Sequence, residues 1–267
     1  MSERFTPRFM KEANAALRGR CALLLLLLIS LSTIGAQWSS TLALPISAGT
    51  IAAPGGVTSG LSFWIDAAET ATLDGTPRVR FWVDKAGRGH ALSAVTPSSA
   101  PYATVVSAKS QAIFEDSVLA LNSPISLEPI TAFFVIRNGL DTGYLPLLGR
   151  IDRGSGFIVD ARRARMMNNG ASTLSGIFGS VLSSGIVLLR TNVGASDAIS
   201  LNGGTELTFS WTSTEAATHV GAVWSATGTR YLRASLSEVA IWDRALTAAE
   251  RTAVLRALGS KWGITVP

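Results

Sequence analysis

Short apolar runs recur along most of this chain, and turn-forming residues separate them at intervals of about 8–12 residues. The runs are rich in Val, Ile, Phe and Trp, and Gly, Pro, Asn and Ser bound them. They have the length of strands rather than of buried helices. We therefore predict strands at 60–67, 78–84, 111–114, 117–122, 130–138, 145–151, 156–161, 185–192, 198–202, 205–211, 218–224, 230–234 and 237–243. This pattern is typical of an antiparallel β-sandwich or barrel.

The end of the chain is different, because a helix follows the last predicted strand. Thr247 and Glu250 form a T-x-x-E capping box, which marks a helix start. Gly259 is placed to end this helix of about eleven residues, which is marginal alone. The helix must therefore pack its apolar stripe on the sandwich, with Trp262 beside it; the stripe consists of Val254, Leu255 and Leu258.

The first 36 residues have the layout of a secretory signal. A basic segment precedes the apolar run from Cys21 to Ala36, and small residues follow. The run is slightly shorter than the roughly 18–20 apolar residues of a membrane span, and the basic segment is long for a cleaved signal. We predict a signal peptide or a signal anchor at 1–36, a Gly/Pro/Ser-bearing linker at 37–59 and one domain at 60–267. The domain is expected to be secreted, periplasmic or at the cell surface, with membrane contact only through an uncleaved leader.

Composition excludes several kinds of site. Cys21 is the single cysteine and lies in the leader, so the domain has no disulfide, zinc-thiolate or iron–sulfur site. The leader also holds five of the 23 basic and two of the 18 acidic residues, which leaves 18 against 16 for the rest. Net charge therefore gives no argument for a nucleic-acid partner.

The ending "LSEVAIWDRALTAAERTAVLRALGSKWGI" resembles the C-terminal signature of bacterial laminin-G-like domains, which belong to the concanavalin A-like jelly-roll superfamily. The matching residues are Glu238, Asp243, Arg244, Leu246, Glu250, Lys261, Trp262 and Gly263. The segments "GLSFWIDA" and "VRFWVDKAGRG" are similar to the opening motifs of that family, through Gly60, Leu61, Trp64, Asp66, Ala67, Val79, Trp82, Asp84, Gly87 and Gly89.

The resemblance covers about residues 60–264 and implies an all-β fold. This fold is a two-sheet antiparallel jelly-roll sandwich with a short C-terminal helix, here preceded by an N-terminal hydrophobic leader helix. It also implies a secreted or surface-bound binding module. Calcium is a cofactor that such domains often hold with loop carboxylates. The candidate ligands are Asp66, Asp84, Asp141 and Asp152, with Glu115 and Asp116 also considered. The alternative is that Asp66 and Asp84 accept hydrogen bonds from turn amides.

Catalytic motifs are absent from the sequence. Glycoside hydrolases of the same superfamily carry E-x-D-x-(x)-E on one strand, and no Glu here is followed two positions later by Asp. Glu115 and Asp116 are adjacent, so on a regular strand they would point to opposite faces. We therefore predict no catalytic residue and no enzyme activity, with a divergent glycoside hydrolase as a remote alternative.

Two kinds of side chain are candidates for ligand binding. Trp211 and Trp224 lie near strand ends and are candidates for exposed sugar stacking, whereas Trp64, Trp82 and Trp242 are expected in the core. Arg163 and Arg165 share one face of a strand and could bind an anionic glycan, or they could protect a sheet edge from aggregation.

The sequence thus predicts a non-catalytic, exported recognition or adhesion module whose partner is a glycan or a surface protein. The alternative is a structural or protein-interaction component of a cell envelope or of a phage or virus particle.

Overall fold

The structure, a computed structural model, describes residues 52–69, 78–106, 109–137, 144–160, 163–168, 171–177, 184–192, 196–212, 214–225 and 228–267. The predicted leader helix and most of the predicted linker lie outside these residues.

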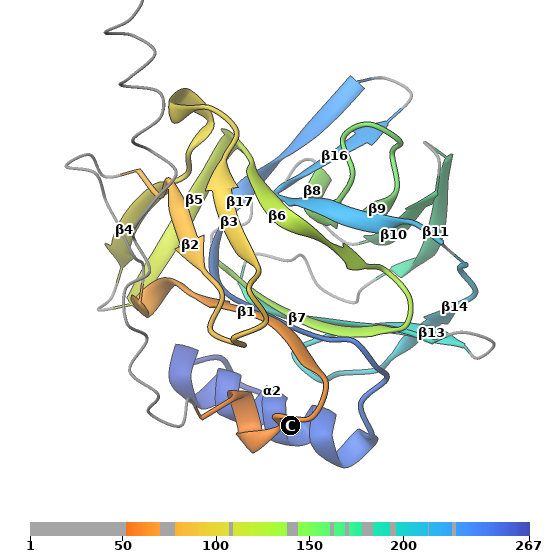
Figure 1. The fold of residues 1–267 in the computed structure, drawn as a ribbon. Coiled ribbons are helices and arrows are strands. Elements are labelled where there is room, and N and C mark those ends of the chain that lie inside the picture. The colour runs from red at the N-terminus through yellow and green to blue at the C-terminus, as the bar shows by residue number, and fades with distance from the viewer. Residues whose placement is uncertain are drawn as a thin grey trace, which may run out of the picture. The chain divides into compact units, whose positions relative to one another are not determined.

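Two antiparallel sheets form the described part of the domain (Figure 1). The first sheet has the strand order β14 (Leu207–Phe209), β13 (Asp197–Leu201), β12 (Gly185–Thr191), β7 (Ile130–Arg137), β17 (Gly228–Trp242), β5 (Lys109–Ser117) and β4 (Tyr102–Val106). β17 also pairs with β1 (Leu61–Asp66) and β16 (Ala222–Ser225). The second sheet has the order β11 (Ala171–Ile177), β10 (Arg163–Asn168), β9 (Gly156–Asp160), β8 (Tyr144–Gly149), β15 (Ala216–Val220), β6 (Leu119–Ser126), β3 (Ala91–Ala94) and β2 (Phe81–Val83).

The main hydrophobic core lies between these sheets. Alternation along each strand sends every second side chain inward. In β1, for example, Phe63 and Ile65 join the core, while Trp64 between them faces the other side of the sheet; Leu61 also faces that side, because the register of β1 shifts between Leu61 and Phe63. The all-β, two-sheet jelly-roll sandwich is therefore confirmed.

β17 is the central strand of the first sheet. It runs for 15 residues, where the sequence predicted two strands at 230–234 and 237–243. The predicted break coincides with a bulge, since the register against β7 shifts between Leu236 and Glu238. The two predicted segments therefore form one strand.

Four strands were not predicted, namely β3, β4, β10 and β11. They are rich in small or polar residues, and pairing with neighbouring strands holds them in the sheets. Asn202 and Gly203 turn the chain after β13: both residues have positive φ angles, and β13 pairs antiparallel with β14.

The C-terminal helix is α2 (Ala248–Trp262). The predicted capping box is present, because the Thr247 side chain accepts from the Glu250 N–H and the Glu250 side chain accepts from the Thr247 N–H. The predicted end at Gly259 is wrong, since the helix continues to Trp262 and Gly263 takes the left-handed cap conformation. Gly259 is instead a packing position, because a Cβ there would lie 2.8 Å from the Ile264 carbonyl oxygen.

α2 covers the outer face of the first sheet, below β1 and β7 in Figure 1. A second hydrophobic cluster forms there between the helix and side chains such as Trp64, Phe133 and Trp242. The short 3-10 helix η1 (Pro54–Gly56), in the segment predicted as the end of the linker, also packs against α2. At Gly55 a Cβ would lie 2.6 Å from the Ala253 carbonyl carbon, so only glycine allows this close approach. Within the described ranges, no helix is long and apolar enough to span a membrane.

Candidate functional site

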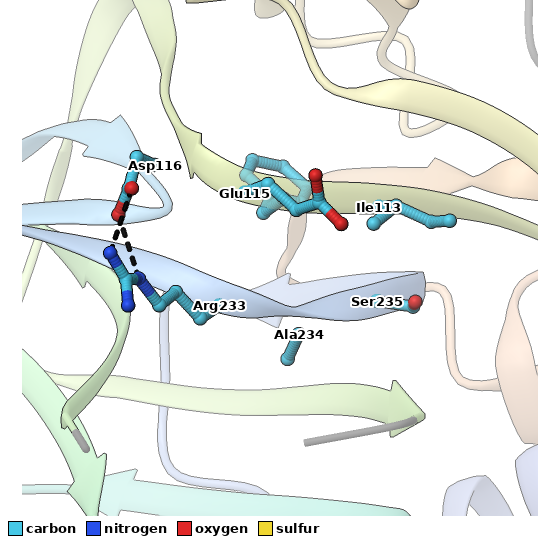
Figure 2. A pocket seen from close by; sticks show the side chains of 7 residues that line it. Ile113, Glu115, Asp116, Arg233, Ala234 and Ser235 are labelled. Atoms are coloured by element: carbon cyan, nitrogen blue, oxygen red, sulfur yellow. Dashed lines mark hydrogen bonds and ion pairs between the residues drawn. The ribbon is translucent and has the colours of Figure 1, made fainter. Parts of the chain in front are cut away.

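A pocket of about 450 Å³ lies where β5 and β17 run side by side (Figure 2). Ile113 and Glu115 of β5, and Arg233 and Ser235 of β17, have their side chains on the outer face of the sheet. Their neighbours Phe114 and Ala234 belong to the core. The lining residues are Ile113, Phe114, Glu115, Asp116, Arg233, Ala234 and Ser235.

A β-bulge shapes this pocket. Leu232 pairs with Ser117 and Arg233 pairs with Glu115, so Asp116 is an extra residue in β5. Asp116 has a φ angle of 56°, in the left-handed region that residues other than glycine seldom adopt. Because of the bulge, the Glu115 and Asp116 side chains are both exposed. The expectation that these adjacent residues would point to opposite faces is wrong for this reason.

Asp116 and Arg233 form a two-pronged ion pair across the bulge. Nε of Arg233 donates to Oδ1 of Asp116 at 2.9 Å, and Nη2 donates to Oδ2 at 2.8 Å. The hydrogen bond from Arg233 lowers the pKa of Asp116. The Glu115 carboxylate has no partner among the described side chains and is directed along β5 toward Ile113 (Figure 2).

These groups suit hydrogen bonding to a hydroxylated ligand. The pocket offers a free carboxylate as an acceptor and the remaining nitrogen of Arg233, Nη1, as a donor, beside the apolar Ile113. Small-ligand sites commonly combine an apolar surface with a few placed polar groups.

A second polar cluster lies under α2 and joins residues from both ends of the domain. The Glu238 side chain is 1% exposed and accepts hydrogen bonds from the indole Nε1 of Trp64 and of Trp262, each at 2.7 Å. Nζ of Lys261 donates to Glu238 at 2.6 Å and to Asp66 at 2.5 Å. Five residues of the family-like motifs therefore meet in one network: Trp64 and Asp66 come from the opening motif, and Glu238, Lys261 and Trp262 come from the C-terminal signature.

Charge balance explains how this network tolerates burial. Burial alone raises the pKa of Asp66, but the hydrogen bond and charge of Lys261, the backbone hydrogen bond from Ala68 and the charge of Lys85 together lower it. Burial likewise opposes the charged form of Lys261, but the Glu238 and Asp66 carboxylates raise its pKa overall. Lys85 adds a second ammonium, 3.2 Å from Asp66. The cluster joins α2 to the sheet through these contacts.

The predicted calcium ligands are used for other contacts. Asp66 binds Lys261 and Lys85, while Asp84 accepts hydrogen bonds from the backbone N–H groups of Trp64, Ala86 and Arg88. Burial raises the pKa of Asp84 although these hydrogen bonds oppose the rise.

Asp152 lies on the loop between β8 and β9, where Arg150 holds its carboxylate and lowers its pKa to about 2. Asp141 lies outside the described residues. Among the residues that the structure describes, no three or more His, Cys, Asp or Glu side chains group as metal ligands do.

The predicted ligand-binding residues do not gather in one place. Trp211 is 6% exposed and belongs to the main core, so its prediction as an exposed stacking residue is wrong. Its backbone N–H donates to the buried Asp197, which draws the chain inward after β14. Trp224 lies on β16, and Arg163 and Arg165 lie two positions apart on β10, opposite Asp160 and Ile158 of β9. Trp64, Trp82 and Trp242 are buried, as predicted.

Sequence reasoning missed Arg233 and Glu238. Arg233 lies in a predicted strand, but its partner Asp116 is 117 positions away, and no local pattern connects the two. Glu238 was part of the recognised signature, and its position in an apolar strand was a signal for a buried, paired carboxylate.

No protein-family model matches the sequence, and no curated protein is detectably similar to it. Three solved structures illustrate the likeness in fold. Domain 4 of a GH43 extracellular arabinanase from Geobacillus stearothermophilus, in complex with arabinotriose, has a TM-score of 0.52 at 10% identity, covering 73% of this chain and 98% of that domain. Trypanosoma rangeli sialidase in complex with the inhibitor DANA has a TM-score of 0.47 at 16% identity, covering 76% of this chain and 33% of the sialidase. The binding domain of botulinum neurotoxin DC in complex with SialylT has a TM-score of 0.49 at 8% identity, covering 76% of this chain and 52% of the toxin chain.

The chain spans about a third of the length of the sialidases that it resembles. At these identities the likeness extends to the fold alone. The class of the molecule is therefore a two-sheet antiparallel β-sandwich, and the arabinanase domain is a solved structure that this chain matches over almost all of that structure's length.

Proposed function

We propose that this domain is a non-catalytic recognition module that binds glycan in the Asp116 pocket. The observation that carries the proposal is the bulge, which presents two carboxylates and a guanidinium around one outward-facing hollow. The fold supports it, because the arabinanase domain of similar architecture was solved with arabinotriose bound. The leader-like sequence at 1–36 adds that the domain acts outside the cytoplasm.

The lowered pKa of the Asp116 carboxyl group favours binding over hydrolysis. Glycoside hydrolysis needs a carboxylic acid that stays protonated to donate to the leaving group, and such an acid has a raised pKa. Asp116 has a lowered pKa because Arg233 binds both of its oxygens. Asp84, whose pKa is raised, is 3% exposed and bonded to backbone amides, so a substrate cannot reach it.

A glycan array probed with the full chain tests the proposal. We expect binding to a subset of glycans that Arg233→Met abolishes, since this variant removes the ion pair and the donor. Arg153→Met is the matched control, because Arg153 is equally exposed but lies beside the second sheet. Absence of binding to any glycan, or equal binding by Arg233→Met, contradicts the proposal. Release of reducing sugar from an oligosaccharide panel contradicts its non-catalytic part.

A protein-interaction role is the second candidate, and one observation favours it. Phe81 and Val83 of the edge strand β2, and Val105 of the edge strand β4, are 54%, 43% and 65% exposed. An isolated bridge between Arg78 and Tyr102 links the chain just before β2 to β4. Exposed apolar side chains on sheet edges are a frequent feature of protein contacts. Co-purification of the full chain in a stoichiometric assembly, lost in Phe81→Ser, supports this candidate.

A further inference from the structure

We infer that the Asp116 pocket selects sugars that carry no negative charge, and that it accepts neutral or amino-bearing sugars in their place. This inference rests on the proposed glycan-binding function and concerns the charge of the ligand. It follows from two observations: Arg233 is already paired with Asp116, and the Glu115 carboxylate has no partner among the described residues.

The cation of the pocket is committed to its own carboxylate. Arginine recognises a carboxylate by presenting two parallel N–H groups to it. In Arg233 the fork formed by Nε and Nη2 already binds Asp116. Three N–H groups remain, two on Nη1 and one on Nη2, and they can donate to hydroxyl groups. The positive charge of the guanidinium is already balanced by Asp116, so an acidic ligand gains less from it than from an unpaired arginine.

The free charge of the pocket is negative. Glu115 stands opposite Arg233 in the strand register, and its carboxylate has no described partner (Figure 2). A carboxylate or sulfate of a ligand placed beside Glu115 would be repelled. A hydroxyl group would donate to Glu115, and an ammonium group would form an ion pair with it.

A neighbouring cation on the same face does not change this balance. Arg137 of β7 pairs with Ser235, at the side of the pocket. Its Nη2 donates to the backbone carbonyl of Trp262, which lies at the C-terminal end of α2. The guanidinium is therefore directed at the helix end, where the helix dipole favours a positive charge. Arg137 does not line the pocket.

The backbone keeps this arrangement in place. Asp116 occupies a left-handed conformation within a paired strand, and the pairs Ser117–Leu232 and Glu115–Arg233 fix the chain on both sides of it. The bulge therefore places the Asp116 side chain beside Arg233, where the two exposed side chains form their ion pair.

The test is calorimetric titration of the full chain with saccharide pairs that differ by one kind of charge. Lactose is compared with sialyllactose, a galactose trimer with a galacturonic acid trimer, and an N-acetylglucosamine tetramer with the glucosamine tetramer. We expect the neutral member of each acidic pair to bind at least tenfold more tightly, and the glucosamine tetramer to bind no more weakly than its acetylated form. Added salt should reduce the difference in affinity between the neutral and the acidic member of each acidic pair.

Glu115→Gln removes the free charge of the pocket and keeps an acceptor oxygen at the same position. Because Glu115 is exposed, the variant should keep the melting temperature, and the preference within the acidic pairs should fall severalfold whatever the change in affinity for the neutral sugars. Tighter binding of the acidic members, lost in Arg233→Met, would overturn the inference and leave glycan binding intact. An unchanged preference in Glu115→Gln would also overturn it. Failure of every saccharide to bind would overturn the proposed function and the inference together.

Discussion

Replacing Lys261 by Met removes the ammonium that two buried carboxylates share. Asp66 and Glu238 are 3% and 1% exposed, and Nζ of Lys261 lies 2.5 Å and 2.6 Å from their oxygens. Removing one partner of a buried pair costs about 3–5 kcal/mol. The Lys261 side chain is 35% exposed, and Lys85 still reaches Asp66, so screening reduces the loss. We expect a decrease of about 2–3 kcal/mol in the free energy of unfolding.

Denaturant unfolding and thermal melts of the full chain measure this loss. For a domain of this size, about 2–3 kcal/mol corresponds to a melting temperature lower by roughly 4–12 °C. Arg256→Met is the matched control, because Arg256 is an exposed cation on the same helix. We expect its free energy of unfolding to change by no more than about 0.5 kcal/mol.

A double-mutant cycle identifies the cause of the loss. In Glu238→Gln the shared charge is already reduced, so adding Lys261→Met should cost less than it does alone. The coupling between two contacting charged residues is expected at about 1–2 kcal/mol. Additive effects, or a Lys261→Met variant as stable as the parent chain, would refute the reasoning that these charges hold α2 on the sheet.

Three further predictions concern the stability of the domain. Leu258→Asp places a charge in the cluster under α2 and should cost several kcal/mol in unfolding free energy, whereas the exposed Thr252→Asp should change it little; equal melting temperatures would show that the helix does not pack. Gly259→Ala should lower the melting temperature although alanine favours helices by about 1 kcal/mol, because its Cβ would press on the Ile264 carbonyl; a rise would contradict this packing. Acid should destabilise the domain: the pKa of Asp66 is lowered on folding, so its contribution is complete above the unfolded pKa near 3.8 and is lost as pH falls through the lower folded value; equal melts at pH 6 and pH 2.5 would refute this.

The periodic apolar runs were sufficient to predict the sandwich and most of its strands. Alternation along a strand is a local property, so the burial of Trp64, Trp82 and Trp242 could be predicted as well. How deeply a residue is buried just after a strand ends depends on tertiary contacts. Trp211 enters the core where its backbone N–H donates to Asp197. The end of α2 was predicted wrongly for a similar reason. Gly259 is required by the close approach of the Ile264 carbonyl and not by the end of the helix, and the sequence does not show that contact.

The candidate site was harder to predict than the fold. Two adjacent acidic residues in an apolar strand give no sign of a bulge, because the extra residue is defined by the pairing of β5 with β17. The left-handed conformation of Asp116 and its partner Arg233 both follow from that pairing. The signature residues Glu238, Lys261 and Trp262 were visible in the sequence, but their role as one buried network depends on contacts with Trp64 and Asp66.

The central position of β17 determines when the domain can fold during synthesis. β1, β5 and β7 all pair with this strand, which follows each of them in the sequence by 90 residues or more. A hydrogen bond joins Trp64 to Glu238 across 174 positions. A chain growing from its N-terminus therefore holds these three strands without their shared neighbour until residues 228–242 have been made. Closing such long loops is slow, so the pairing of β1, β5 and β7 with β17 is expected to form late.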